Sequence, residues 1–273
     1  MIEILKAVIL GIVQGITEWL PVSSTGHMIL VDEFIKLNFS ERFISTFLVV
    51  IQFGSILAVL LIFFNKLNPF DGSKTHEEKK GTLDLWAKVI VAVIPSGIIG
   101  LLFEDTIDRL FFNPTTVAVA LVVYGIIMIR IENRDKKPSV SDFSEVSYKL
   151  ALGIGLFQCL ALIPGTSRSG STIIGATLLG ASRYVAAEFS FFLAIPTMLG
   201  ASALKLVKAG FAFSGFEWLV LLVGSVVAFV VSVIVIKFFM DYIKKHDFKA
   251  FGYYRIVLGI IVFAYFCAIP MLA

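Results

Sequence analysis

Residues 163–170 read Ile-Pro-Gly-Thr-Ser-Arg-Ser-Gly, a polar segment in the middle of a long apolar stretch. The surrounding residues 150–182 carry one formal charge, that of Arg168. A similar break, Leu-Pro-Val-Ser-Ser-Thr-Gly at residues 20–26, interrupts the first apolar stretch, whose single charge is Glu18. Irregular backbone at membrane depth is tolerated only where it faces protein or a water-filled cavity. We therefore predict two re-entrant hairpins, each made of a helix, a polar loop and a second helix.

The composition places the whole chain in a membrane. Hydrophobic residues make up 58% and charged residues 16% of the 273 residues, whereas ordinary soluble domains have about 45–50% and about 25%. This excludes disordered, collagen-like, coiled-coil and disulfide-stapled chains. The net charge of +3 is too balanced to indicate a nucleic-acid partner. We predict an all-α integral membrane protein in which residues 1–273 form a single membrane domain.

Six further apolar runs are candidates for membrane-spanning helices, which need about 20 residues, with a range of roughly 17–25. Two runs are shorter and carry a central proline, Pro95 or Pro196. Proline is tolerated inside membrane helices when neighbouring groups satisfy the freed backbone. The six predicted spans lie at residues 43–64, 89–103, 110–129, 189–204, 218–236 and 256–273.

The segments between the spans differ in their basic residues, and this difference predicts the orientation. Segments 66–88, 130–149 and 237–249 carry 14 lysines and arginines, against five counted in the inter-span segments of the opposite side: Lys36, Arg42, Arg109, Lys205 and Lys208. An excess of Lys and Arg marks the cytoplasmic side. Both termini are therefore predicted to lie outside. The first hairpin would enter from outside and the second from the cytoplasm.

The order of hairpins and spans predicts an internal repeat. Residues 1–135 and 145–273 each contain one hairpin followed by three spans, and the odd number of crossings inverts the second copy. Gly-Ile-Val-Gln at residues 11–14 is similar to Gly-Leu-Phe-Gln at residues 155–158. Inverted repeats with broken helices place a polar site near the membrane midplane. We expect the functional residues on the two hairpins.

The first hairpin offers an acid, an amide, an imidazole and several hydroxyls. Gln14 and Glu18 are four residues apart and share a helix face, so they could hold a divalent cation against a phosphate. Ser24 and His27 begin the next helix, whose free N–H groups attract an anion. A plain capping role for Ser24 and a buried, singly bonded His27 remain open. The polar side chains of this hairpin are Gln14, Glu18, Ser23, Ser24, Thr25 and His27.

The second hairpin places one guanidinium among hydroxyls and glycines at a helix start. Arg168 has a planar fork of donors that suits phosphate, and it could also form an ion pair with Glu18. The two roles are compatible if substrate or metal inserts between them. Together the tips suit phosphoryl transfer, in which catalysis is positioning plus charge stabilisation. The hydroxyls near Arg168 belong to Ser167, Ser169, Ser171 and Thr172.

Two long motifs carry a resemblance to a known family. Gln-Gly-Ile-Thr-Glu-Trp-Leu-Pro-Val-Ser-Ser-Thr-Gly-His at residues 14–27 resembles the first signature of the undecaprenyl-diphosphatase family, the bacitracin-resistance lipid phosphatases. Pro-Gly-Thr-Ser-Arg-Ser-Gly-Ser-Thr at residues 164–172 resembles the second signature. The resemblance continues through nearly the whole chain, including residues 188–194. Gln14 stands where the family has Glu or Gln, so two metal-binding carboxylates are not implied.

The resemblance implies a substrate, a reaction and a location. The enzyme would hydrolyse undecaprenyl pyrophosphate to undecaprenyl phosphate, the lipid carrier of peptidoglycan precursors, in the bacterial plasma membrane. It would confer bacitracin resistance and depend on Mg²⁺ or Ca²⁺. By matching position, the resemblance implies the functional set Glu18, Ser24, His27, Ser167, Arg168 and Thr172.

We expect each residue of the two tips to take one role. A cation at Glu18 and Gln14 would neutralise the pyrophosphate, while Arg168 holds the terminal phosphate. Ser24 would attack in line with His27 as its base; alternatively, His27 activates water and Ser24 only donates a hydrogen bond. The predicted substrate-binding residues are Ser23, Thr25, Ser167, Ser169 and Thr172.

Two other classes of membrane protein are alternatives to this family. A lipid or anion transporter, or a flippase, could use the same inverted repeat. Lipid phosphatases of the phosphatidic-acid type need two catalytic histidines, one within His-x-x-x-Asp, and the sequence has no such motif. The partners we expect are the polyprenyl pyrophosphate lipid and the bilayer, and self-association of the chain is left open.

Overall fold

The computed structural model describes residues 1–134, 137–210 and 212–268, with side chains for all of these except 104, 267 and 268. Helices dominate the described part of the chain, and its only β-structure is one isolated bridge. The elements are α1 (Ile2–Thr17), α2 (Ser24–Phe34), α3 (Glu41–Ile62), α4 (Phe64–Leu67), α5 (His76–Phe111), α6 (Pro114–Glu132), η1 (Phe143–Glu145), α7 (Tyr148–Gln158), η2 (Cys159–Leu162), α8 (Arg168–Leu178), α9 (Arg183–Ala209), α10 (Gly215–Tyr242), α11 (Lys249–Phe263) and η3 (Ala264–Ala268).

Six of the described helices, α3, α5, α6, α9, α10 and α11, are long and apolar enough to cross a membrane. The six predicted spans are thereby confirmed for the described residues, and residues 269–273 of the last one lie outside them. Several helices extend beyond the apolar runs. Helix α5 begins at His76, after a capping box formed by Thr75 and Glu78. Lys79 and Lys88 therefore lie on a helix, as does Lys80, and their expected position in a loop was wrong. The start of a helix is set by its N-cap, and its backbone hydrogen bonds continue past the ends of the apolar run. A spanning helix can therefore be longer than the apolar run that predicts it.

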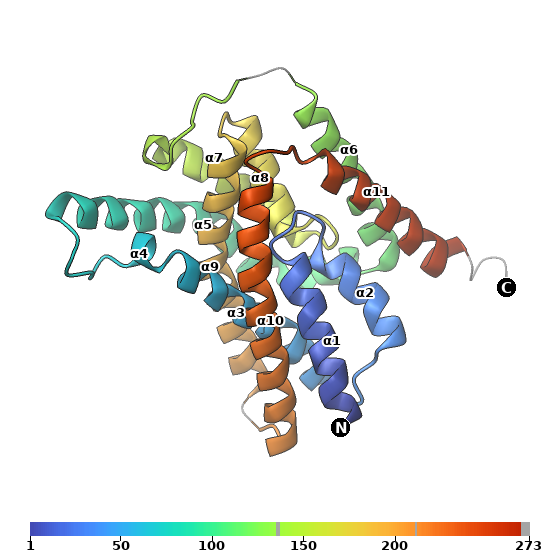
Figure 1. Ribbon diagram of the computed structural model, residues 1–273. Coiled ribbons are helices and arrows are strands. Elements are labelled where there is room, and N and C mark those ends of the chain that lie inside the picture. Colours follow the sequence, from blue (N-terminus) through green and yellow to red (C-terminus); the bar gives the residue numbers. More distant parts are fainter. Residues whose placement is uncertain (135–136, 211, 269–273) are drawn as a thin grey trace.

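Helices α3 and α9 form the centre of the bundle (Figure 1). Residues 185–195 of α9 are buried on all sides, which is typical of a helix with no solvent or lipid face. Trp19 at the end of the first hairpin helix is fully buried and meets Phe191 edge to face, with ring centroids 5.2 Å apart. The first loop tip is thus packed directly on the central helix.

Glycines let the first helix of each hairpin approach a spanning helix closely. A Cβ at Gly15 of α1 would lie 2.8 Å from the carbonyl oxygen of Ala228 on α10. A Cβ at Gly155 of α7 would lie 2.2 Å from the carbonyl oxygen of Ala92 on α5. Small residues are the usual means of close helix packing in membranes. The pairs α1–α10 and α7–α5 correspond as a repeat requires, and the inverted repeat itself stays a prediction.

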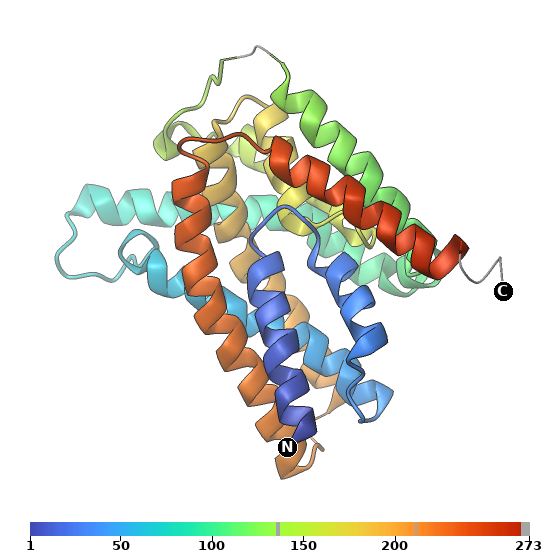
Figure 2. The ribbon, with the colours of Figure 1, turned by 45° about the vertical axis from the view of Figure 1, so that its right-hand side comes forward.

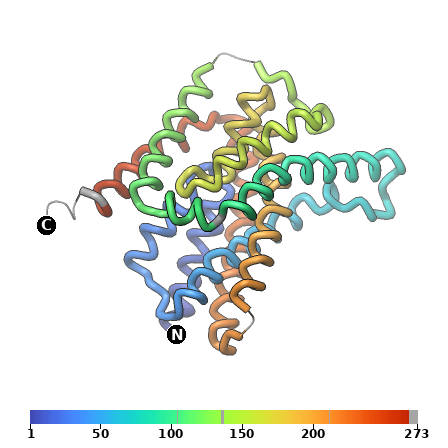
Figure 3. Tube along the Cα trace, turned by 180° about the vertical axis from the view of Figure 1, so that it is seen from behind, coloured from blue at the N-terminus to red at the C-terminus, as the bar shows by residue number. Residues whose placement is uncertain are grey.

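Both predicted hairpins are a helix, a loop and a second helix. The two loops meet in the middle of the molecule, where the loop between α1 and α2 lies beside the loop before α8 (Figures 1 and 3). Ser169 Oγ donates to the carbonyl oxygens of Glu18 and Leu20 at 3.1 and 3.2 Å. Helices α6 and α11 lie side by side next to these loops (Figure 2). That either unit is re-entrant, and that the two enter from opposite membrane faces, stays a prediction.

Two of the basic segments meet at one end of the molecule, the upper end in Figure 1. Arg134 and Lys137 after α6, Lys244 after α10 and Lys249 at the start of α11 line a cavity of about 790 Å³ there. The N-terminus lies at the other end (Figure 1). The side of the membrane on which each end lies stays a prediction.

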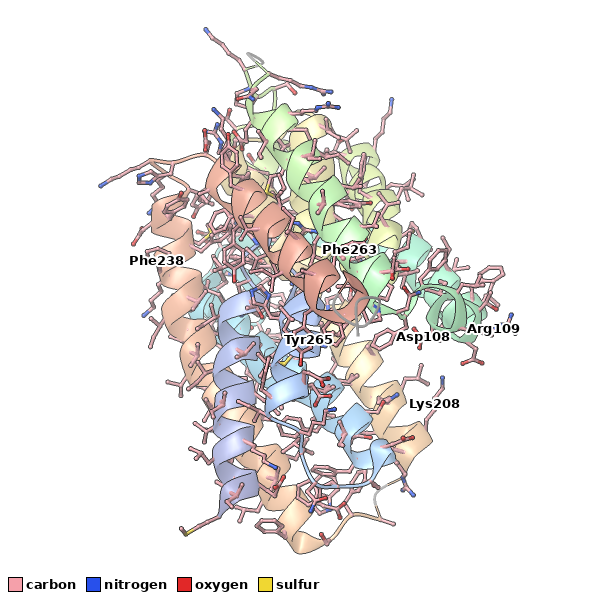
Figure 4. The ribbon with its side chains drawn as sticks, turned by 90° about the vertical axis from the view of Figure 1, so that its right-hand side faces the viewer. Asp108, Arg109, Lys208, Phe238, Phe263 and Tyr265 are labelled. Carbon is pink, nitrogen blue, oxygen red and sulfur yellow. The ribbon has the colours of Figure 1, made fainter. Side chains whose placement is uncertain are left out.

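Large apolar side chains cover the outside of the bundle. Phe238 on α10 and Phe263 on α11 are 60% and 47% exposed and lie on outer faces of their helices (Figure 4). A soluble protein rarely exposes such surface over wide areas. These apolar faces are suited to contact with the lipid bilayer.

Candidate active site

The same strained turn starts the second helix of each hairpin. Ser23 and Ser167 both have a φ of 73°, and they are the only non-glycine residues with positive φ in the described part of the chain. Each serine caps its helix: Ser23 Oγ accepts from the N–H of Gly26 at 3.3 Å, and Ser167 Oγ from that of Gly170 at 3.1 Å. Such backbone costs about 1–3 kcal/mol and is concentrated at functional sites. The turns therefore place the N-termini of α2 and α8 at the two loop tips.

The carboxylate of Glu18 is the centre of the hydrogen-bond network. Glu18 is 5% exposed. Its Oε2 accepts from Gln14 Nε2 at 2.9 Å and from Ser24 Oγ at 3.0 Å. Its Oε1 accepts from Arg168 Nη2 at 3.2 Å. The ion pair between the two hairpins that the sequence suggested is therefore present, and Gln14 and Ser24 complete it.

Arg168 is also held by the central helix, through a residue that the sequence analysis missed. Its Nη1 donates to the carbonyl oxygen of Ser190 at 2.8 Å and to Ser190 Oγ at 3.3 Å. Thr172 Oγ1 lies 2.7 Å from the same Ser190 Oγ. The guanidinium lies 5.7 Å from the ring centroid of Trp19. Ser190 is one of three hydroxyl residues in the apolar run 189–204, with Thr197 and Ser202, so little in the sequence distinguished it.

Arg255 of α11 is a second buried guanidinium that the sequence analysis missed. It is 0% exposed and has no carboxylate partner among the described residues. Its Nη1 donates to the carbonyl oxygen of Pro21 at 3.2 Å, and its Nη2 to those of Gly165 and Thr166, both at 2.9 Å. Arg255 therefore joins the two loop tips from outside both hairpins. In the sequence, Arg255 directly precedes the uncharged run 256–273 and looks like an ordinary basic residue at the end of a membrane span.

His27 faces away from Ser24. Its Nδ1 donates to the carbonyl oxygen of Ser23 at 2.7 Å, and its Nε2 lies 2.6 Å from Tyr254 Oη. The His27 and Tyr254 rings are stacked at 5.5 Å. No hydrogen bond joins Ser24 to His27 in the described part of the chain, because the Ser24 hydroxyl donates to Glu18 instead.

Most of the predicted site residues lie together at the two tips. Ser169 ties the tips through its hydroxyl, which also lies 3.2 Å from Ser167 Oγ. Thr25 is half-buried and makes no hydrogen bond with its side chain in the described structure. The residues that the structure brings together are Gln14, Glu18, Ser23, Ser24, Ser167, Arg168, Ser169 and Thr172.

The charges of the site do not balance. Two guanidinium groups lie at the tips, that of the fully buried Arg255 and that of Arg168, whose side chain is 10% exposed, together with one buried carboxylate, Glu18. The N-termini of α2 and α8 add partial positive charge at the same place. A buried charge is costly unless it is paired. The arrangement therefore favours an anion between the tips.

The side chains of the site offer enough ligands for a cation only if a bound anion supplies further ligands. The described residues contain no group of three or more His, Cys, Asp or Glu side chains that could hold a metal ion. Glu18 offers one carboxylate and Gln14 an amide oxygen. Mg²⁺ is commonly bound by one or two carboxylates together with substrate phosphates and water. Gln14 and Glu18 would fit that mode of binding once the Gln14 amide, whose Nε2 donates to Glu18 in this structure, turns its oxygen toward the cation.

These features define a multi-pass membrane protein in which two polar loop tips meet around the ion pair of Glu18 and Arg168. The family model described as "Bacitracin resistance protein BacA" matches residues 7–261. The chain belongs to this family.

Curated relatives agree with the family match over almost their whole length. The chain is 82% identical to "Undecaprenyl-diphosphatase 1" of Clostridioides difficile (strain 630) over 97% of each chain. It is 59% identical to "Undecaprenyl-diphosphatase" of Acetivibrio thermocellus, over 98% of this chain and all of the relative. It is 61% identical to "Undecaprenyl-diphosphatase" of Enterococcus faecalis, over 96% of each chain.

Proposed function

We propose that the protein is a membrane phosphatase that hydrolyses undecaprenyl pyrophosphate to undecaprenyl phosphate and inorganic phosphate. The reaction returns the lipid carrier to peptidoglycan synthesis and gives resistance to bacitracin. The observation that carries the proposal is the unbalanced positive charge of Arg168 and Arg255 at two helix N-termini, with Ser24 bonded to Glu18 beside it. A pyrophosphate supplies the missing negative charge. The exposed apolar helix faces suit its prenyl chain.

The hydrogen bonds of the site support a two-step mechanism. Arg168, with Ser167 and Thr172, holds the terminal phosphate, and the N–H groups of α2 and α8 stabilise its charge. Ser24 Oγ attacks the terminal phosphorus and passes its proton to Glu18, its hydrogen-bond partner. Undecaprenyl phosphate leaves, and water then cleaves the phosphoserine with His27 as base. Glu18 returns its proton to Ser24.

Phosphate release in detergent separates this proposal from a transporter or flippase. The purified protein in detergent micelles has no bilayer across which to move lipid. We expect it to release phosphate from undecaprenyl pyrophosphate and expect the Arg168→Ala variant to release very little. A protein that binds the lipid in detergent and releases no phosphate would be a transporter.

We propose that a divalent cation, Mg²⁺ or Ca²⁺, binds at Gln14 and Glu18 and neutralises charge on the phosphates. EDTA is therefore expected to abolish phosphate release, and added Mg²⁺ or Ca²⁺ to restore it. Glu18→Gln should lose most activity while it still inserts and folds, as checked by thermal unfolding. Full activity in EDTA would remove the metal from the mechanism.

We also propose that both termini lie outside the cell. The support is the basic character of segments 66–88, 130–149 and 237–249 and the meeting of the last two at one end of the molecule. Single cysteines added at each terminus should react with an impermeant maleimide in intact cells. A cysteine placed at Ser144 should react only after lysis. The opposite pattern would reverse the topology.

A further inference from the structure

Helix α11 reaches the site with two adjacent side chains, Tyr254 and Arg255. Neighbouring residues on a helix point about 100° apart. The helix can therefore contact α2 with Tyr254 and both loop tips with Arg255. Three hydrogen bonds from Arg255 fix α11 relative to the tips. The position of Tyr254 relative to the site is therefore set by buried contacts, although its ring is 47% exposed.

The surroundings of His27 determine which ring nitrogen can accept a proton. Nδ1 faces the carbonyl oxygen of Ser23 at 2.7 Å, and a carbonyl only accepts hydrogen bonds, so Nδ1 carries a hydrogen. The lone pair of the neutral ring is then on Nε2. Tyr254 Oη lies 2.6 Å from Nε2, so its hydroxyl donates to that lone pair. The basic nitrogen of His27 is thus already occupied by Tyr254.

We propose that Tyr254 is the proton relay between His27 and the attacking water; this rests on the proposed phosphatase function. One hydrogen of the water passes to Tyr254 Oη as the Tyr254 proton passes to Nε2 of His27. The water oxygen forms a bond to phosphorus at the same time, and the phosphorus–oxygen bond to Ser24 breaks. Tyr254 is neutral before and after the step, and His27 ends protonated. The proton on His27 then leaves with the departing phosphate.

The relay explains how His27 can act as a base without contacting Ser24. The hydroxyl of Tyr254 has a second lone pair that faces no described residue, so it can accept from water. The rings are nearly parallel, with an interplanar angle of 8° and centroids 5.5 Å apart, and the Tyr254 hydroxyl lies at hydrogen-bond distance from Nε2. Tyr253 gives a matched control because it is adjacent, 59% exposed and without a hydrogen bond in the described structure.

The test is a double-mutant cycle on purified full-length protein, with phosphate release as the readout. We expect Tyr254→Phe to lower kcat by at least about 10-fold with KM within about twofold, and Tyr253→Phe to behave as wild type. Loss of general base catalysis in His27→Ala should cost roughly 10²–10⁴-fold. Adding Tyr254→Phe to His27→Ala should change the rate by less than about twofold, because the two residues act in one step.

Three outcomes would overturn the relay. A normal kcat in Tyr254→Phe would show that the hydroxyl is not needed. Losses that multiply in the double variant would show that the two residues act separately. A lowered Tm in Tyr254→Phe, together with a loss of kcat of the same size in Tyr253→Phe, would indicate that Tyr254 has a structural role. If the wild-type protein itself releases no phosphate, the proposed function fails, and that result is distinct from all three.

Discussion

Replacing Ser24 by alanine is expected to lower phosphate release at least as strongly as the roughly 10²–10⁴-fold loss that removal of a general base causes. The reason is that the attacking oxygen itself is lost. Ser24 Oγ is placed for attack by its hydrogen bond to Glu18 at 3.0 Å and by its position at the N-terminus of α2. The measurement is the initial rate of phosphate release by purified protein.

A second measurement decides whether Ser24 forms a covalent bond. Acid-quenched wild-type enzyme should carry phosphate on Ser24, detectable by mass spectrometry, and the adduct should accumulate in His27→Ala. Thr177→Ala, which removes one half-buried hydroxyl bonded within α8, should keep normal turnover. Near-normal turnover in Ser24→Ala would contradict nucleophilic attack and favour water activated by His27.

Arg168→Lys is expected to be nearly as damaging as Arg168→Ala, with a loss of about 10²-fold or more in both. Loss of one oxyanion donor typically costs about 2.7–4 kcal/mol. The guanidinium reaches Glu18 with one nitrogen and Ser190 with the other. A lysine ammonium keeps the charge but cannot bridge both partners in the same plane.

The comparison needs a control for the Arg-to-Lys change itself. Arg183 forms two-pronged contacts with Glu132 at the cytoplasmic end predicted for the bundle, away from the tips. Arg183→Lys should therefore keep near-normal turnover. If Arg168→Lys keeps more than about a third of the wild-type rate, a loss of under ~1 kcal/mol, the bidentate role of Arg168 is wrong.

The sequence was informative where one local pattern decides the structure. Apolar runs predicted the six spans, and the Gly, Pro and Ser breaks predicted two helix-loop-helix units. Rare charges at membrane depth predicted that Glu18 and Arg168 matter, and the structure joins them. Ser23 and Ser167 were recognised as candidate site residues at helix starts, and both are N-caps.

The sequence did not predict the features of the site that depend on packing between distant segments. Arg255 and Tyr254 lie about 230 residues from their partners Pro21 and His27. Nothing local distinguishes Arg255 from a basic residue at the end of a span. The expected Ser24–His27 pair follows from their spacing of three residues on a helix, but the turn at Ser23 directs His27 to α11 instead. Only the tertiary structure reveals this direction.

The central claim is that the site removes the terminal phosphate of a polyprenyl pyrophosphate. It is tested most directly with undecaprenyl pyrophosphate that carries radioactive phosphorus in its terminal phosphate only. Purified wild-type protein should convert all of the label to inorganic phosphate and form one unlabelled undecaprenyl phosphate for each phosphate released. Label recovered as inorganic pyrophosphate, or label that stays in the lipid, would contradict the proposed reaction.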